Sequence, residues 1–361
     1  MAEHHAPPPA PTPRRALRAR VAARPRGRGR LLNVLVIGGN RFVGYDLVWR
    51  LLAGGHDVTL FNRGTLADPF ADRVQRLRGD RTTDAFDRAL SGRSFDAVVD
   101  FAGFVGADVE RAVQVLQGHV GHYVFISTGQ VYLVREPRPS PAREADYDGP
   151  LMAEPPPGHA DHDDWAYGVG KRAGEDVLVA AFARDGFPST RLRVPIINGE
   201  RDHTRRLESY LWRLLDGGPL LVPDGGTHRL RHVYARDVAR AIAGLLGERR
   251  TFGQAYNVCQ EETPTLAEVL EMLARLVGAP LRLCPVPRAA IEAAGLDPRR
   301  VSPFSGRWMS FLDPGRARTE LGFVPTPLPA YLGSIVASFL AHPPPAPPDA
   351  YTARPRERAL A

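Results

Sequence analysis

LLNVLVIGGNRFVG, residues 31–44, joins an uninterrupted apolar run to a glycine-rich turn. An apolar run without alternation is typical of a parallel strand that is buried on both faces of its sheet. From Phe42 to Leu52 the apolar residues recur at helical spacing, so a helix follows the turn directly. This order of strand, glycine turn and helix predicts the first unit of a Rossmann-type, doubly wound parallel α/β sheet whose turn binds a dinucleotide. The alternative is a plain tight turn between a strand and a helix.

The turn itself indicates how a dinucleotide would be held. Glycines allow the backbone to approach a pyrophosphate, and unpaired N–H groups at the start of the helix point toward the anion. Arg41 stands where the fingerprint has its middle glycine, and it adds a cation beside the phosphates. The predicted cofactor-binding residues of the turn are Gly38, Gly39, Asn40, Arg41, Phe42, Val43 and Gly44.

The choice of cofactor depends on the end of the second predicted strand. The acid expected there for the adenosine ribose hydroxyls is replaced by Asn62-Arg63. Without a carboxylate a 2′-phosphate is not repelled, and Arg63 can pair with it, so NADP is slightly favoured over NAD. Otherwise Arg63 is a solvated loop residue. Asp80, after the third strand, either accepts a hydrogen bond from the adenine amino group or has a capping role.

Strand and helix patterns alternate along the first half of the chain without hairpin signals, which predicts right-handed crossovers. The stretch 133–164 is rich in proline and acids and has no period, so we expect a lid or a binding loop there. The predicted parts of the chain are a disordered Pro/Arg-rich tail (1–30), a Rossmann domain (31–197) to which segments of 230–258 can return, a smaller C-terminal α+β substrate-binding lobe (198–341) and a disordered Pro-rich tail (342–361).

The basic character of the chain is confined to its first 30 residues. These carry eight arginines and one acid, which equals the net charge of +7 of the whole chain. The nearly neutral body gives no indication of a nucleic-acid-binding fold, so nucleic acid is an expected partner only through this arm. No run of about 18 apolar residues occurs, and we expect no membrane span. Two cysteines make neither a disulfide framework nor a metal site, so we expect a cytoplasmic protein with no metal.

A single lysine, Lys171, stands among 47 basic residues. Because all the remaining Lys or Arg positions are arginine, the lysine at position 171 indicates chemistry that needs a compact point charge. Tyr167 lies four residues earlier, and residues i and i+4 share one face of a helix. An ammonium beside a phenol lowers the pKa of the tyrosine toward working pH, which suits a general acid or base. The alternative is a surface lysine on a helix.

Tyr167-Gly-Val-Gly-Lys171, together with the early glycine turn, resembles the short-chain dehydrogenase/reductase superfamily. The additional C-terminal lobe makes the chain similar to the extended branch, the NAD-dependent epimerase/dehydratase family of sugar-nucleotide enzymes. The glycine turn and Phe61–Gly64 also resemble an atypical subgroup that includes chloroplast stem-loop RNA-binding proteins. Further segments that resemble the extended branch are ISTGQVY (126–132), LRVPIING (192–199), YARDVARAI (234–242) and AYNVCQEETPTLAEVL (255–270).

The resemblance implies roles for individual residues. Thr128, with Ser127 as its fallback, would hydrogen-bond the substrate oxygen that is oxidised or reduced. Tyr167 would be the general acid or base, and Lys171 would bind the nicotinamide ribose and lower the pKa of the tyrosine. The implied residues beyond this catalytic set are Phe101, Ala102, Gly103 and Pro195 at the cofactor, and Gln130 beside Thr128 at the substrate. Independently of the resemblance, Arg231 is a candidate to pair with a substrate diphosphate, or else a surface strand arginine.

The expected function is that of an NAD(P)-dependent epimerase or ketoreductase that acts on a nucleotide-linked sugar by hydride transfer, with a homodimer as a possible assembly. Dehydration is demoted, because the Asp-Glu pair of the resembling 4,6-dehydratases is replaced here by Gly129-Gln130. The rival class is a non-catalytic nucleotide- or RNA-binding protein of the stem-loop-binding type.

Overall fold

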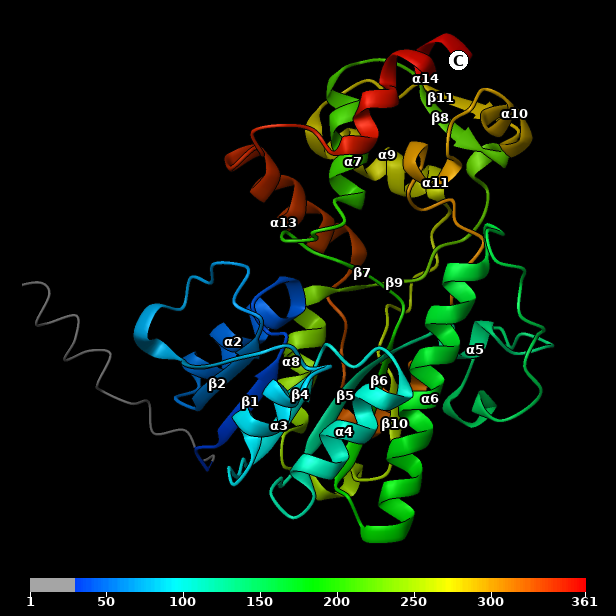
Figure 1. Ribbon diagram of the computed structural model, residues 1–361. Coiled ribbons are helices and arrows are strands. Elements are labelled where there is room, and N and C mark those ends of the chain that lie inside the picture. The colour runs from blue at the N-terminus through cyan, green and yellow to red at the C-terminus, as the bar shows by residue number, and fades with distance from the viewer. Residues whose placement is uncertain (1–29) are drawn as a thin grey trace, which may run out of the picture.

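The computed structural model describes residues 30–361, and its centre is a seven-stranded parallel sheet of strand order β3-β2-β1-β4-β5-β6-β10. This is the doubly wound Rossmann-type arrangement predicted from residues 31–44 (Figure 1). The strands are β1 (Asn33–Ile37), β2 (Asp57–Asn62), β3 (Gln75–Arg78), β4 (Ala97–Asp100), β5 (Tyr123–Thr128), β6 (Ser189–Val194) and β10 (Ala255–Asn257).

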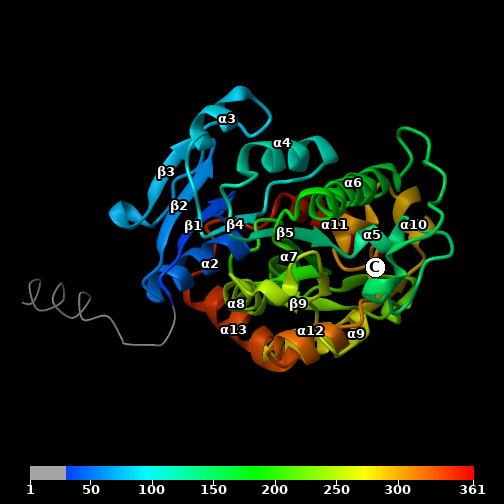
Figure 2. The ribbon, with the colours of Figure 1, turned by 90° about the horizontal axis from the view of Figure 1, so that it is seen from below.

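Helices cover both faces of this sheet, as Figure 2 shows. Val34 and Val36 of β1 pack in the apolar core on one face, while Leu35 and Ile37 pack in the core on the other. This is why the β1 sequence shows no polar alternation. The helices on the two faces are α3 (Asp84–Leu90), α4 (Gly106–Leu116) and α6 (His162–Asp185) on one side, and α2 (Phe42–Ala53) and α8 (Ala235–Leu245) on the other.

A second lobe stands beyond the carboxyl ends of the strands and has an apolar core of its own (Figure 1). Two parallel strands, β8 and β11, form its small sheet. Its elements are α7 (Arg206–Leu215), β8 (Leu220–Pro223), α9 (Leu266–Val277), β11 (Leu283–Val286), α10 (Arg288–Ala293), α11 (Pro298–Val301) and α13 (Leu328–Ala341).

The chain crosses between the two bodies more than once. β7 (Ile196–Asn198) pairs with β9 (His232–Tyr234) at the crossing. After it, α8 packs in the same core as α2, and β10 adds to the edge of the large sheet beside β6. α12 (Gly315–Leu321) also packs against this core through Ala317. The short helices not named elsewhere are α5 (Gln130–Leu133), η1 (Ala71–Arg73), η2 (Glu144–Tyr147), η3 (Asp224–Gly226) and η4 (Arg249–Thr251).

The C-terminal residues differ from their expected disorder. After a proline-rich connection, η5 (Asp349–Ala353) and α14 (Arg354–Leu360) lie against α7 in the second lobe. Glu357 is fully buried and accepts a 2.9 Å hydrogen bond from Nε of Arg213. Arg354 donates to Asp216 at 2.6 Å. The proline-rich composition predicted disorder, but buried ion pairs fix this segment. The N-terminal arginine arm, residues 1–29, lies outside the described residues.

Candidate active site

A cleft of about 1380 Å³ lies between the carboxyl ends of the parallel strands and the second lobe. This edge of an open α/β sheet is where such folds bind ligands. The volume exceeds the several hundred Å³ of a pocket for one small molecule, so it can hold a dinucleotide and a substrate together. Among the predicted site residues, those that line the cleft are Gly38, Asn40, Arg41, Phe42, Val43, Gly44, Asn62, Arg63, Asp80, Phe101, Ala102, Thr128, Gln130, Tyr167, Lys171 and Pro195.

The glycine turn forms the cleft wall where β1 passes into α2. Gly38 has φ +81°, a left-handed conformation that favours glycine. A Cβ on Gly44 would lie 2.7 Å from Cα of Gly39, and a Cβ on Gly39 would lie 2.4 Å from Cγ1 of Val36. Gly39 and Gly44 therefore let the start of α2 approach the end of β1, and Gly39 itself does not line the cleft.

The end of β2 presents an unpaired donor to the cleft. Oδ1 of Asn62 accepts a 2.9 Å hydrogen bond from the backbone N–H of Gly64. Nδ2 of Asn62 is buried and has no partner within residues 30–361. An orphaned buried donor beside the glycine turn fits a ribose hydroxyl or phosphate oxygen of a dinucleotide. Oδ1 of Asp80 accepts 2.9 and 2.8 Å hydrogen bonds from N and Oγ1 of Thr82, which orders this loop, and the residue lines the cleft.

Lys171 is buried in α6 behind the cleft floor, with 2 % of its surface exposed. Its ammonium donates hydrogen bonds to the carbonyl oxygens of Gly103 at 2.6 Å and Ile126 at 2.7 Å. It also lies 5.1 Å from the ring centroid of Phe104 and 4.7 Å from that of Phe125. Burial lowers the pKa of Lys171 to about 8, although the charge of the nearby carboxylates opposes this shift. The surface-lysine alternative is thereby wrong.

Tyr167 lies one turn before Lys171 and lines the cleft. Although 38 % of its surface is exposed, that surface opens into the cleft, and burial raises the pKa of the phenol while the Thr128 hydroxyl counteracts the rise. The expected lowering of this pKa by Lys171 is therefore wrong for this structure. The reason is that burial of the phenol outweighs the Thr128 hydrogen bond. The ammonium itself donates to two backbone carbonyls.

Ser127 and Thr128, the two hydroxyl residues at the end of β5, make different contacts. Oγ of Ser127 donates a 2.5 Å hydrogen bond to the buried carboxylate of Glu175, so this hydroxyl is committed to the interior. Oγ1 of Thr128 accepts a 3.2 Å hydrogen bond from the backbone N–H of Gln130. Nε2 of Gln130 donates to Asp164 at 3.0 Å. Thr128 thus remains the better candidate for contact with a substrate oxygen.

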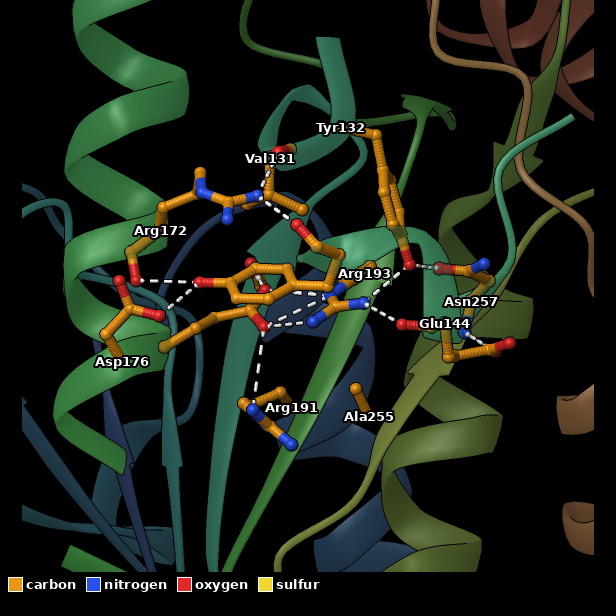
Figure 3. A network of polar contacts seen from close by, with 12 residues as sticks. Val131, Tyr132, Glu144, Arg172, Asp176, Arg191, Arg193, Ala255 and Asn257 are labelled. Carbon is orange, nitrogen blue, oxygen red and sulfur yellow. Dashed lines mark hydrogen bonds and ion pairs between the residues drawn. The ribbon is translucent and has the colours of Figure 1, made fainter. Parts of the chain in front are cut away.

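A buried ionic network around Arg193 had no clear signal in the sequence (Figure 3). Nη2 of Arg193 contacts Glu175 at 2.5 Å, and Nη1 donates to the Tyr132 hydroxyl at 2.5 Å. That hydroxyl donates to Asn257 at 3.0 Å. Burial alone would raise the pKa of Glu175, but the Arg193 guanidinium holds it below its usual value. The network ties β5, β6, β10 and α6 together behind the candidate catalytic residues.

Arg231 does not reach the cleft, which corrects its predicted substrate role. Its Nη1 donates a 2.7 Å hydrogen bond to the carbonyl oxygen of Leu312. Gly103 likewise does not line the cleft, and its carbonyl instead receives Lys171. The basic residues that line the second-lobe end of the cleft are Arg205, Arg206, Arg288, Arg299, Arg300 and Arg307. The adjacent pairs Arg205-Arg206 and Arg299-Arg300 are visible in the sequence, but only the fold brings them together with Arg288 and Arg307.

The parallel sheet, the glycine turn and the cleft shared with a second lobe define an extended short-chain dehydrogenase/reductase. The chain belongs to the NAD dependent epimerase/dehydratase family, whose model matches residues 34–259. No helix within residues 30–361 is both long and apolar enough to cross a membrane.

Three known proteins illustrate this relationship. The chain is 27% identical over 262 residues to the chloroplast stem-loop binding protein of 41 kDa b from Arabidopsis thaliana, a match that spans 68% of this chain and 64% of that protein. It is 27% identical over 289 residues to 2'-dehydrokanamycin reductase from Streptomyces kanamyceticus, spanning 79% of this chain and 77% of the reductase. The structure of UDP-glucose 4-epimerase with UDP-glucose from Thermotoga maritima has the same fold, with a TM-score of 0.68, 19% identity and coverage of 86% of this chain and 99% of the epimerase.

Proposed function

We propose that this protein is an NAD(P)-dependent reductase or epimerase that transfers a hydride to or from a carbon of a nucleotide-linked sugar. The observation that carries the proposal is the arrangement of Thr128 and Tyr167 on the cleft, with the buried Lys171 directly behind them. The similarity to a reductase and an epimerase supports the same chemistry.

In the proposed reaction, NAD(P) supplies or accepts the hydride when it is bound. The Thr128 hydroxyl binds the oxygen on the reacting carbon and orients it. Tyr167 has a raised pKa and is protonated at neutral pH, so its hydroxyl can donate the proton to the oxygen of a ketone as the carbon receives the hydride. The ketone becomes an alcohol by taking up the hydride and the Tyr167 proton, the cofactor is left oxidised, and the tyrosinate regains its proton from water. A protonated phenol suits the donor role in ketone reduction.

The substrate class is inferred from the arginines at the second-lobe end. Arg299 pairs with Asp164 at 2.8 Å, and Arg288 lies 3.7 Å from Asp224. Arg300 and Arg307 have no carboxylate partner within residues 30–361, and both line the cleft. Guanidinium groups without partners suit the diphosphate of a nucleotide-linked sugar.

NADP remains the slightly favoured cofactor within this proposal. Asn62 and Arg63 line the cleft at the end of β2, where no carboxylate stands to repel a 2′-phosphate. Arg63→Ala should weaken NADP binding about tenfold or more, the loss typical of a charge-assisted contact, with little change for NAD. Equal weakening for both cofactors would show that Arg63 does not select between them.

The deciding experiment combines cofactor content with turnover. The purified protein is denatured and its released nucleotides are identified, and the protein is then assayed for NADPH and NADH oxidation with nucleotide-linked 4-ketosugars. An empty site with ketone-dependent oxidation of added cofactor supports a reductase, and a retained dinucleotide with interconversion of sugar epimers supports an epimerase. Absence of dinucleotide binding in both tests would overturn the proposal.

A second candidate function is RNA binding, which the similarity to the chloroplast stem-loop binding protein favours. Eight arginines in residues 1–30 supply the charge for it, since the rest of the chain is nearly neutral. Retention of a stem-loop RNA that falls steeply with salt, and that deletion of residues 1–29 abolishes, would assign binding to the arm. Retention that survives the deletion would assign it to the folded body.

A further inference from the structure

Asp100, the last residue of β4, is a fully buried carboxylate that the proposed reaction does not use. Its Oδ1 accepts hydrogen bonds from the backbone N–H groups of Ala102 at 2.8 Å and Gly103 at 3.0 Å. Nη1 of Arg81 lies 2.8 Å from both carboxylate oxygens, and the Tyr123 hydroxyl donates to Oδ2 at 2.5 Å. Every lone-pair direction of the carboxylate is thus in use, which fixes the turn that follows β4.

The turn held by Asp100 is the same one that holds Lys171. The peptide N–H of Gly103 points to Asp100, and its carbonyl oxygen receives the Lys171 ammonium at 2.6 Å. A Cβ on Gly103 would lie 2.8 Å from the Phe125 ring, so the turn has no room to shift toward β5. The position of the Gly103 carbonyl, and with it that of the ammonium, therefore depends on the carboxylate of Asp100.

Four charged groups act on the buried ammonium from the elements around it. Asp100 on β4, Glu175 on α6 and Asp108 on α4 stabilise the charged form of Lys171, and Arg81 after β3 opposes it. Asp100 has the largest effect of these four. Arg81 in turn keeps the pKa of Asp100 below its ordinary value despite complete burial, so the carboxylate is ionised at neutral pH.

We propose that Asp100 is a positioning residue for Lys171: its buried carboxylate fixes the turn of residues 101–103 so that the Gly103 carbonyl holds the ammonium. This inference rests on the proposed role of Lys171 in the reaction. The position and charge of the ammonium can nevertheless be measured without any assay of activity.

The single lysine makes this measurement direct, because protein labelled with 13C- or 15N-lysine gives one side-chain NMR signal. In the wild type the signal should titrate near pH 8. Asp100→Asn retains an acceptor for the two N–H groups but loses the charge, and the midpoint should fall by about one unit. Tyr123→Phe is the matched control, since it removes one hydrogen bond to Asp100 and leaves the turn and the carboxylate charge in place.

Asp100→Glu separates position from charge. Its longer side chain keeps the charge but cannot accept both backbone N–H groups from the same place, so the lysine signal should broaden or shift and the dinucleotide should bind about tenfold more weakly. If Asp100→Asn does not fold, the double variant Asp100→Asn/Arg81→Gln takes its place. It removes both members of the buried ion pair and so leaves no unpaired buried charge. The turn still loses the carboxylate that fixes it, so the lysine signal should still shift or broaden.

The outcomes separate this inference from the proposed function. An unchanged lysine midpoint in the folded charge-removing variant overturns the role of Asp100. A lowered midpoint with an unchanged pH profile of turnover supports the role of Asp100 and removes Lys171 from the proposed reaction. A lowered midpoint accompanied by an equal shift of the alkaline limb of turnover supports both.

Discussion

Arg299 of α11 forms a 2.8 Å ion pair with Asp164 of α6, which joins the second lobe to the helix that carries the candidate catalytic residues. Nη2 of Arg299 also donates to the carbonyl oxygen of Ala160 at 2.6 Å. Nearby, the Trp308 indole N–H donates to Asp161 at 2.9 Å. The first turn of α6, three residues before Tyr167, is therefore fixed by the second lobe. A substrate bound between the lobes would find the two already connected by the Arg299–Asp164 ion pair.

Arg299→Ala should raise KM for the sugar substrate several-fold and change dinucleotide affinity little, because the contact lies at the second-lobe end of the cleft. The free energy of unfolding should fall by no more than about 1 kcal/mol, since the two side chains are 46% and 26% exposed. Steady-state kinetics and thermal melting check both expectations. Arg318→Ala is the control, because it removes an exposed 2.7 Å pair with Glu261 that lies away from the cleft. An equal change of KM in both variants would contradict a role for the lobe contact.

Tyr167→Phe should retain the fold and dinucleotide binding but lose turnover by about 10²–10⁴-fold, the usual contribution of a positioned proton donor. The raised pKa of Tyr167 means that wild-type ketone reduction should persist at neutral pH, and that loss through ionisation of the phenol should come at more alkaline pH than any limb that follows Lys171. A pH profile of kcat for the wild type and turnover of the variant at pH 7 provide the measurement. Near-wild-type turnover in the variant would remove Tyr167 from the mechanism.

Glu357→Gln should destabilise the protein by about 3–5 kcal/mol, because it leaves the Arg213 guanidinium buried without its counter-charge. Denaturant unfolding followed by fluorescence measures this loss. Arg356→Ala, on the exposed side of the same short helix, should change the free energy of unfolding by only a few tenths of a kcal/mol. If Glu357→Gln is as stable as Arg356→Ala, the C-terminal helix is not anchored as described.

The parts of this structure that the sequence predicts are those fixed by local pattern. The apolar run of β1, the turn from Gly38 to Gly44 and the spacing of Tyr167 and Lys171 each lie within a few residues, and the fold places them together at one cleft. The buried Glu175–Arg193 pair lay beyond such reasoning, because its partners are brought together only by the packing of α6 against β6.

The wrong expectations share a physical cause, which is that charge acts through tertiary contacts. Arg231 stands at a plausible place in the sequence, but the Leu312 carbonyl binds it away from the cleft. The pKa of Tyr167 rises instead of falling, because burial outweighs the opposing Thr128 hydroxyl. The Lys171 ammonium meanwhile donates to the Gly103 and Ile126 carbonyls. No local pattern indicates which acceptors a buried cation will find.

Lys171→Arg should weaken dinucleotide binding at pH 7, although it retains the positive charge. The broad guanidinium cannot donate to the Gly103 and Ile126 carbonyls as the compact ammonium does between the Phe104 and Phe125 rings. The variant should also lose a pH dependence. Because the pKa of Lys171 is lowered from 10.5 to about 8 in the folded state, wild-type dinucleotide affinity should fall as pH rises through 8. Arginine stays charged over this range, so the affinity of the variant should be weaker but constant from pH 7 to pH 9.

Stability provides the independent check on the same substitution. Between about pH 8 and pH 10.5 the unfolded chain binds the lysine proton and the folded chain does not, so this group makes the free energy of unfolding rise with pH in that window. That contribution should vanish in Lys171→Arg, leaving a flatter curve than the wild type. Dinucleotide titrations at pH 7 and 9, with urea unfolding across the same range, measure both effects. If both sets of curves overlay the wild type, Lys171 has no special role, and the catalytic assignment of α6 is wrong.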